Sequence, residues 1–382
     1  MNIVIITSNS KYQQQQRILS LRSQYWAQQG HSVVFLNMNH PKFLSDLFDH
    51  DKHPQTVIFW GPFYSIFITL MGNHTKGLST YLTSPSVGHI GDHPFAEWLA
   101  RSLELNKNLT FIGREVKYKD ALQFLLGHNS IDFRLIDAIQ YRPIELKHSV
   151  EIIDHSKREI DFLVPMDFRQ NTPSLVHAFE LLKTLKIKKS TFDKICNEMI
   201  VSLDVYPLDI VVEHLSSTQI KNIQFNPQNK HRFLSALHIL DMQTRKRRRI
   251  DILKKTIDLN PQYQFLVLSS EVKALAHYDN IVYLGPQRFD DYSTLLANSK
   301  NVVFSSPTYP NVINERYCDA ILYQTNIMSD VNTSIKNLPF SEKLKPHTFI
   351  HDQINTRDSE MIDFFNHSPT VAERLLHIFE GL

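Results

Sequence analysis

The chain has 382 residues, 42 % of them hydrophobic and 21 % charged, and its formal net charge is +2. This length suits two domains, and the composition is that of a globular protein with no electrostatic need for nucleic acid. Cys196 and Cys318 are too far apart to indicate a disulfide framework or a zinc motif, and the first residues lack the basic region of a signal peptide. We therefore expect a cytoplasmic protein.

Apolar runs of strand length alternate with helical patterns in the first half of the chain. A helix pattern precedes Gly30, which suits the residue that follows a helix. The predicted strands are 3–7, 32–37, 56–60, 87–90 and 110–112, and the predicted helices are 14–29 and 63–71. Apolar strands separated by helices indicate a parallel sheet covered on both faces. The most apolar window, 57–72, is too short to cross a membrane.

A second α/β series follows a polar stretch at 141–158, where we place the crossing between domains. Its predicted strands are 160–165, 264–268, 281–284, 302–305 and 326–329, and its predicted helices are 173–185, 190–203 and about 231–257. We expect domains at 1–150 and 151–345, then a helical tail at 346–382 that can pack back on the first domain. The predicted fold is α/β, with two Rossmann-like domains whose parallel sheets face each other across a cleft.

Glycine is scarce, with ten residues in the whole chain. Neither GxGxxG nor GxxxxGK[ST] occurs, and the turn after the first strand, SNSKYQ, has no glycine. Dinucleotide cofactors and P-loop phosphates need a close backbone approach that glycine permits. We therefore expect no cofactor.

The clearest chemical signal is the segment 302–332. A buried strand ends in a proline-containing loop, which is where ligands bind in open α/β sheets. A helix starting near Asn314 carries Glu315, Arg316 and Asp319 in its first turns, and the two carboxylates share one face. They can accept hydroxyls of a ribose or hexose, and the free backbone N–H groups suit a diphosphate. The alternative is that Glu315 caps the helix and Asp319 is solvated.

This segment resembles the CgeB-like branch of the glycosyl transferases group 1 superfamily, which has the GT-B fold. Glu315-Arg316 matches its "ER", Asp319-Ala320 its second acidic residue and alanine, and Asp330 its late aspartate. Four segments before this one are also similar to the family: IDFLVPMDFRQNTP, RKRRRIDILKKTI, QFLVLSS and IVYLGPQRFDDYSTLLANSKNVVF. The resemblance therefore covers 160–332. The chain departs from the family at Asn311, at Asp319 and at Gln324, where the family has glutamate, glutamate and glycine.

The resemblance implies a donor site in the second domain. Its expected residues are Arg245, Arg249, Gly285, Ser306, Tyr309, Asn311, Asn314, Glu315, Arg316, Asp319 and Asp330. Arg245 or Arg249 would meet the donor diphosphate, because a guanidinium binds phosphate bidentately. At least three members of the basic run 245–249 would be surface charges, since neighbouring helix positions point in different directions. A solvated helix face and a nucleic-acid patch are the alternatives.

No HExxH motif and no His/Cys set at zinc spacing occurs among the nineteen histidines. Asp49-His50-Asp51 superficially resembles the DxD of metal-dependent transferases, but it stands alone in a polar stretch that we expect to be a surface loop. No metal is expected.

The predicted acceptor side lies in the first domain. Asp92 and His93 follow a strand, and an inverting enzyme needs a general base there, although Asp92 can equally cap the helix that Pro94 opens. Trp60, Gly61 and Arg114 also stand at strand ends and can line the same cleft.

The sequence thus predicts a metal-independent glycosyltransferase that moves a sugar from a nucleoside diphosphate sugar to a hydroxyl acceptor. Glu315 is assigned to catalysis along with Asp92 and His93. The rival interpretations are a nucleotide-sugar epimerase or phosphorylase, and a catalytically silent binding protein, which Asn311 and Gln324 favour. Donor base, acceptor, stereochemistry, peripheral membrane contact and oligomeric state stay open.

Overall fold

The computed structural model describes residues 1–7, 13–61, 77–90, 109–126, 132–136, 139, 151–168, 171–202, 204–305, 312, 315–330 and 359–382, with backbone alone at 13–17, 125–126, 289 and 315.

The N-terminal sheet has six parallel strands in the order β2-β1-β3-β4-β5-β6. Its elements are β1 (Asn2–Thr7), α1 (Gln13–Gln28), β2 (Ser32–Asn37), α2 (Phe43–Asp51), β3 (Thr56–Trp60), β4 (Ser86–Ile90), β5 (Leu109–Gly113), α3 (Lys117–Leu126) and β6 (Phe133–Leu135). Every residue of β3 and β5 is buried, as expected for a sheet covered on both faces. The strand order reverses between β1 and β3.

The C-terminal sheet has five parallel strands in the order β11-β10-β7-β8-β9. Its elements are β7 (Ile160–Val164), β8 (Phe265–Val267), β9 (Ile281–Tyr283), α9 (Phe289–Ala297), β10 (Ser299–Phe304), α10 (Glu315–Leu322), β11 (Asn326–Ser329) and α12 (Ser359–His367). The order reverses between β7 and β10, which makes the carboxyl ends of these strands the expected place for a ligand.

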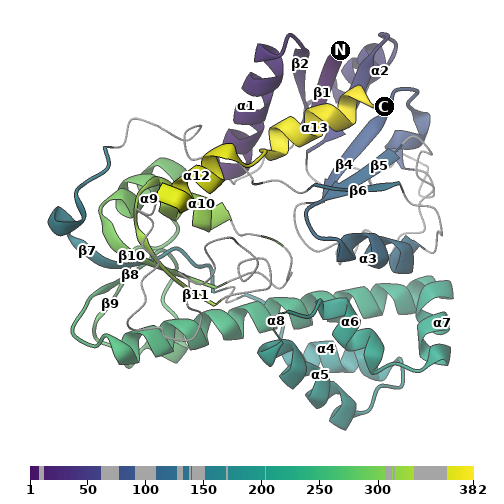
Figure 1. Cartoon of the computed structure of the whole chain (residues 1–382). Coiled ribbons are helices and arrows are strands. Elements are labelled where there is room, and N and C mark those ends of the chain that lie inside the picture. The colour runs from purple at the N-terminus through teal and green to yellow at the C-terminus, as the bar shows by residue number, and fades with distance from the viewer. Residues whose placement is uncertain are drawn as a thin grey trace.

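A helical layer is inserted between β7 and β8. It consists of α4 (Leu175–Lys183), α5 (Lys189–Val201), α6 (Pro207–Glu213), α7 (Ser217–Phe225) and the 33-residue α8 (Pro227–Leu259). Asn226 and Pro227 start α8, because the Asn226 side chain accepts the N–H groups of residues 228 and 229 and proline needs no N–H partner there. In Figure 1, α8 runs across the lower part of the molecule, below both sheets and above α4 and α5.

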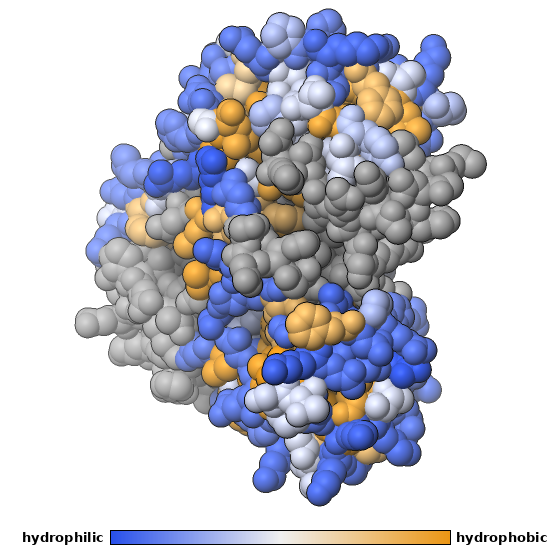
Figure 2. Space-filling model, turned by 90° about the vertical axis from the view of Figure 1, so that its right-hand side faces the viewer, coloured by the Kyte–Doolittle hydropathy of each residue, from blue (hydrophilic) through white to orange (hydrophobic). Residues whose placement is uncertain are grey.

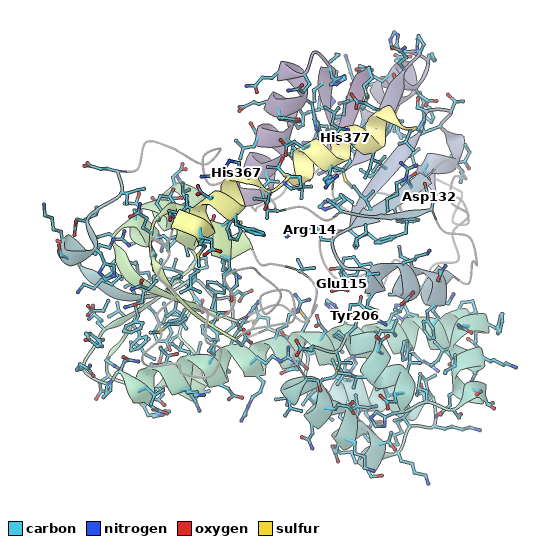
Figure 3. All side chains as sticks on the ribbon, viewed as in Figure 1. Arg114, Glu115, Asp132, Tyr206, His367 and His377 are labelled. Carbon is cyan, nitrogen blue, oxygen red and sulfur yellow. The ribbon has the colours of Figure 1, made fainter. Side chains whose placement is uncertain are left out.

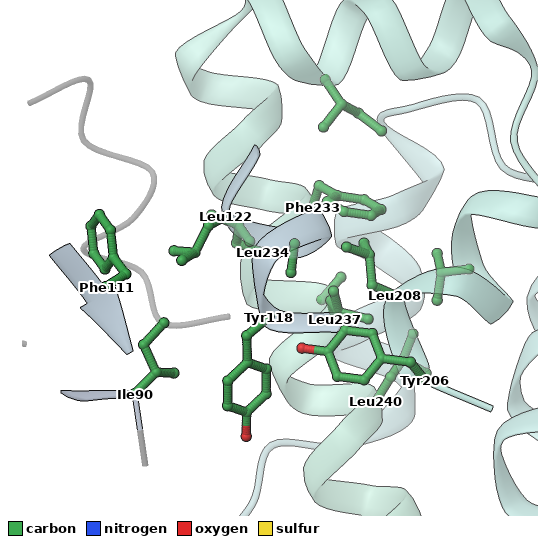
Figure 4. Close-up of a cluster of buried hydrophobic side chains, with 14 of the residues drawn as sticks. Ile90, Phe111, Tyr118, Leu122, Tyr206, Leu208, Phe233, Leu234, Leu237 and Leu240 are labelled. Carbon is green, nitrogen blue, oxygen red and sulfur yellow. The ribbon is translucent and has the colours of Figure 1, made fainter. Parts of the chain in front are cut away.

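The helical layer joins the two halves of the chain. The first half of α8 shares a hydrophobic core with α3 and the N-terminal sheet (Figure 4). In this core the rings of Phe233 and Phe124 are 5.8 Å apart between centroids. Lys117 of α3 forms a 3.0 Å ion pair with Asp209 of α6. The second half of α8 packs in the core of the C-terminal sheet.

The chain returns to the N-terminal domain through α13 (Val371–Glu380), which crosses beside α1 in Figure 1. The indole Nε1 of Trp26 donates to the carbonyl of Ala372 at 2.9 Å. Val371, Leu375 and Phe379 share a core with the N-terminal strands. Residues more than 340 positions apart in sequence therefore complete one hydrophobic face.

The predicted fold class, α/β with two Rossmann-like domains built on parallel sheets, is confirmed, and every described strand predicted from sequence is present. The helix expected at 63–71 and most of the crossing at 141–150 lie outside the described residues. The predictions missed α2, α3, α6, α7 and β6.

The loop expected around Asp49-His50-Asp51 is wrong, because these residues form the last turn of α2. The Asp51 carboxylate accepts the backbone N–H groups of Thr83 at 2.9 Å and Ser84 at 2.8 Å. Its role is therefore to hold the chain that leads into β4.

Candidate functional site

Two polar residues meet at the carboxyl edge of the C-terminal sheet, beside the point where the strand order reverses. Ser305 follows β10 and Asp330 follows β11, and the Ser305 hydroxyl donates to Asp330 Oδ2 at 2.9 Å. Parallel pairing of β10 with β11 brings these strand ends together. The expected Asp330 thus lies where a ligand binds in this type of sheet.

Helix α8 brings its basic run toward the same edge. Arg249 donates through Nη1 to the backbone carbonyl of Asp167, which follows β7. Arg248 is buried and donates to the carbonyls of Met199 at 2.7 Å and Ser202 at 2.5 Å. The α8 guanidinium groups are therefore anchored near the ends of β7 and α5.

Charge links Arg248 to the strand ends. Burial lowers the pKa of Arg248, and the carboxylates of Asp330 and Asp241 act in the opposite direction. Asp330 therefore lies within electrostatic reach of Arg248. Arg248 could not be predicted as a site residue, because its burial depends on α5 and on strand ends far away in the chain.

Arg245, the other arginine expected at the diphosphate, is buried and engaged. Its Nε donates to Asp241 Oδ2 at 3.0 Å, and both side chains are at most 6 % exposed. In the run 245–249, Arg247 is exposed and paired with Asp251 at 2.8 Å. The expectation that at least three of these residues lie at the surface agrees with the structure, since Arg245 and Arg248 are buried while Lys246, Arg247 and Arg249 reach solvent.

The carboxylate of Asp319 lies between α9 and α10. It is 2 % exposed, and the Tyr292 hydroxyl donates to its Oδ2 at 3.3 Å. The alternative of a solvated Asp319 is therefore wrong. Glu315 is the first residue of α10, one turn earlier on the same face, and Arg316 is half-buried. If Asp319 binds a ligand hydroxyl, its carboxylate would accept hydrogen bonds from both that hydroxyl and Tyr292.

Arg158 holds the far end of α10 and was not anticipated. Its guanidinium donates to the carbonyls of Ser299 at 2.7 Å, Tyr323 at 2.8 Å and Gln324 at 3.1 Å. It is 3 % exposed. It therefore fixes α10, and with it Glu315 and Asp319, against β10. No local sequence signal marks it, because all of these acceptors are backbone atoms.

Gly285 is also at the carboxyl edge, after the edge strand β9. Its φ is +73°, the left-handed conformation that favours glycine, and no atom lies within 4 Å of where a Cβ would stand. The strands β8 and β7 separate it from Ser305. The structure thus joins Ser305 to Asp330 with Arg248 in electrostatic reach of Asp330, and it leaves Gly285 beyond β7 and β8.

The predicted acceptor side is only partly described. Trp60 is wholly buried, so it does not line an open surface. Gly61 is required for a close approach, since a Cβ there would stand 2.8 Å from the carbonyl oxygen of Ile6. Arg114 follows β5 and lies between the N-terminal sheet and α8 (Figure 3). The remaining expected residues, Asp92, His93, Ser306, Tyr309, Asn311 and Asn314, lie outside the described residues.

A hollow of about 650 Å³ lies at the opposite, amino edge of the N-terminal sheet, lined by Met1, Pro54, Thr83 and Leu382 among others. It is remote from both carboxyl edges. Within the described ranges, no group of three or more His, Cys, Asp or Glu side chains is arranged to hold a metal ion.

No helix in the described part of the chain has both the length and the apolar character needed to cross a membrane. On the face shown in Figure 2, hydrophobic residues form separate patches among hydrophilic ones.

No family model and no curated protein matches the chain. Among solved structures, the chain is similar to WaaG, a glycosyltransferase involved in lipopolysaccharide biosynthesis, at 10 % identity and a TM-score of 0.42 over 100 % of this chain and 96 % of that chain. It is similar to an alpha-glucosyltransferase in complex with UDP and a mismatched 13-mer DNA at 7 % identity and a TM-score of 0.48 over 100 % of both chains. It is also similar to MnaA of S. aureus with UDP at 10 % identity and a TM-score of 0.40 over 97 % of this chain and 92 % of that chain.

Proposed function

We propose that the chain is a glycosyltransferase that moves a sugar from a nucleoside diphosphate sugar to a hydroxyl of an acceptor. The observation that carries the proposal is the grouping at the carboxyl edge of β7, β10 and β11. There the Ser305–Asp330 pair, Arg248 and Arg249 meet beside the strand reversal. Acids that accept hydroxyls and guanidinium groups that bind phosphate are the two recognition elements that such a donor needs.

In the proposed mechanism, the donor diphosphate lies beside Arg249, and its oxygens face the amino end of α10, where the helix dipole favours negative charge. Glu315 and Asp319 accept hydroxyls of the sugar or ribose. Positive charge stabilises the nucleoside diphosphate as it leaves, so no metal ion is required. Asp92 or His93 serves as the base if the reaction inverts the anomeric centre.

Ligand binding is the direct test. In a thermal-shift screen of UDP, GDP, ADP and their sugars, one nucleotide should raise the melting temperature, because a ligand at 100 times its Kd stabilises the native state by about 2.7 kcal/mol. Slow hydrolysis of the matching sugar donor, insensitive to EDTA, should follow. If no nucleotide shifts the melting temperature, the proposal is wrong. Binding without hydrolysis or transfer would instead indicate a silent binding protein.

The basic run offers a matched pair of variants. Arg249→Met should weaken nucleotide binding by about tenfold to a hundredfold, the value of one charge-assisted contact. Arg247→Met removes an exposed arginine two residues away on the same helix, at 64 % side-chain exposure, and should leave nucleotide binding unchanged. Equal losses in both variants would point to the general charge of α8 instead of a defined site.

A further inference from the structure

Strand β2 is a long free edge of the N-terminal sheet. The two sheets end in four edge strands, β2, β6, β9 and β11. β6 and β9 have three residues each, and three of the four residues of β11 are buried. β2 has six residues, of which Ser32 and Phe35 are exposed. Of these four edges, β2 therefore offers the longest accessible backbone to another strand.

The backbone of β2 leaves a regular set of hydrogen-bonding groups unpaired. In the parallel ladder with β1, the N–H of Ser32 bonds to the carbonyl of Met1 at 3.1 Å. Backbone groups alternate in direction along a strand, so Val33 and Phe35 direct theirs away from β1. In the described part of the chain, the N–H and C=O groups of Val33 and Phe35 have no partner. They form a template for pairing with another strand.

The sequence of β2 lacks the features by which edge strands avoid such pairing. Natural edges are protected by charged side chains, proline or bulges. The strand reads SVVFLN, without charge or proline, and its register with β1 runs without a bulge. The edge strand β6, by contrast, carries Arg134 at its centre. Phe35 is 46 % exposed. β2 thus combines residues that favour strands with an unprotected apolar edge.

The free groups of β2 match those of a second copy of the same strand. When two copies run antiparallel about a twofold axis at Val34, Val33 of each copy stands opposite Phe35 of the other. Such a pair exchanges both of its N–H···O bonds, so every outward group of the two residues is used. The pairing also sets a β-branched side chain against an aromatic ring, which is a favourable cross-strand pair. The strand is therefore complementary to itself.

Helix α1 suits the same arrangement. It packs against β2 on the face of the sheet that carries Val33. A twofold axis perpendicular to the sheet brings the α1 helices of both copies onto one face, where a charged helix would repel its own copy. Among the α1 side chains that the structure describes, 18–28, Arg22 alone is charged, and it is buried. The exposed ones are neutral: Ser20, Gln24, Ala27 and Gln28. Such depletion of charge is typical of the centre of an interface.

We propose that β2 pairs antiparallel with β2 of a second copy of this chain and joins the two N-terminal sheets into one. A stable dimer needs about 800 Å² of surface from each partner, more than one short strand supplies, so α1 contributes the remainder. In Figure 1, β2 lies at the top of the molecule, whereas the C-terminal sheet lies at the lower left. The proposal therefore does not depend on the transferase function.

The first test is the oligomeric state of the full chain, measured by sedimentation over a series of concentrations. Wild type should form a concentration-dependent dimer. Phe35→Lys places a charge beside the free edge, as natural edges do, and should raise the dimer dissociation constant by about tenfold or more. Phe225→Lys is the matched control, because Phe225 is 82 % exposed at the end of α7, which lies far from β2 (Figure 1). It should keep the wild-type dissociation constant.

A cysteine at the twofold axis tests the register. Val34→Cys places two thiols at a non-hydrogen-bonded pair, whose Cα atoms are about 4.5 Å apart, within the range of a disulfide. Mild oxidation should therefore link two chains. Phe35→Cys is the control, since residues 35 of the two copies stand diagonally, about 7–8 Å apart, and should not link.

Several outcomes would overturn the proposal. A monomer at every concentration is one, and equal dimerisation of wild type and Phe35→Lys is another. Linking of both cysteine variants, or of Phe35→Cys alone, would contradict the antiparallel register. The circular dichroism spectrum of Phe35→Lys should match that of wild type. If this variant fails to fold, the two cysteine variants, which add no charge, decide between the proposed pairing and none.

Discussion

Gln324 occupies the position where the resembling family has glycine, and its backbone keeps the glycine conformation. Its φ is +52°, and the N–H of Thr325 bonds to the carbonyl of Ala320 at 2.8 Å in the turn that ends α10. The departure at 324 therefore changes the side chain without changing the turn. It gives no support to a silent binding protein.

A left-handed conformation costs a non-glycine residue roughly 1–2 kcal/mol, and glycine avoids this strain. Part of that gain is offset because glycine gives the unfolded chain more conformational entropy. We therefore expect Gln324→Gly to raise the free energy of unfolding by about 0.5–1 kcal/mol. Urea denaturation measures it, and Gln324→Ala, which keeps the strain, serves as the control. A destabilised glycine variant would contradict this account.

Asp51 provides a pH-dependent contribution to stability. Burial acts to raise its pKa, but the hydrogen bonds from Thr83 and Ser84 outweigh it and leave the pKa below its ordinary value. A depressed carboxyl pKa stabilises the fold at pH values above the unfolded pKa, near 3.9, and this contribution disappears as pH falls through the folded pKa.

Asp51→Asn should therefore unfold at lower urea concentration than wild type at pH 7, by about 1 kcal/mol or less because the group is partly exposed. The difference should shrink on acidification below the unfolded pKa. Asp49→Asn changes an exposed neighbour that pairs with Lys52; it is the control and should change stability little. A constant difference at all pH values would show that charge is not involved.

At the scale of elements, α10 depends on Arg158 for its carboxyl end. Removing the guanidinium leaves several buried carbonyl groups without donors, at about 1–3 kcal/mol each. Arg158→Met should thus lower the free energy of unfolding by about 3 kcal/mol or more. Arg158→Lys can reach fewer carbonyl groups, so its free energy of unfolding should fall between those of wild type and Arg158→Met in the same denaturation experiment. A near-wild-type Arg158→Met would mean that water replaces these bonds.

Helix α8 contributes the central side chains of the shared core in Figure 4. Phe233 is wholly buried there, so Phe233→Ala should destabilise the protein by about 3–5 kcal/mol. Phe225 at the end of α7 is 82 % exposed, and Phe225→Ala should stay within about 0.5 kcal/mol of wild type. Similar losses in both would contradict the packing shown.

For the whole molecule, the sequence predicted what depends on local pattern. Buried parallel strands appear in the sequence as continuous apolar runs, so the predicted bounds of β3 and β11 agree with the structure. The predicted β10 ends within a residue of the observed strand but lacks its first residues. Short elements such as α6 and β6 have too few residues to show a period. The sequence could predict that the candidate site lies at strand ends. It could not predict the burial of Asp319 and Arg248, because that burial depends on partners far away in the chain.

The helical layer packs across the boundary that the sequence predicts near residue 150. Residues of α4 to α8, which follow that boundary, share a hydrophobic core with Val4, Ile58 and Phe111 of the N-terminal sheet. The hydrophobic pattern of the sequence shows where a second series of strands and helices begins. Only contacts in the folded structure show which hydrophobic core a helix belongs to. Fragments cut at 150 would expose the faces of α3 and α8 that meet in this core.

The position of α13 has a consequence for biosynthesis. The core that encloses Trp26 and Phe59 is incomplete until Val371, Leu375 and Phe379 have been added. While the ribosome is still translating the second sheet, the first sheet therefore stays partly uncovered on the face that α1 shares with α13. The first sheet is completed only after the second has been made, and a nascent chain should recruit chaperones until α13 emerges from the exit tunnel.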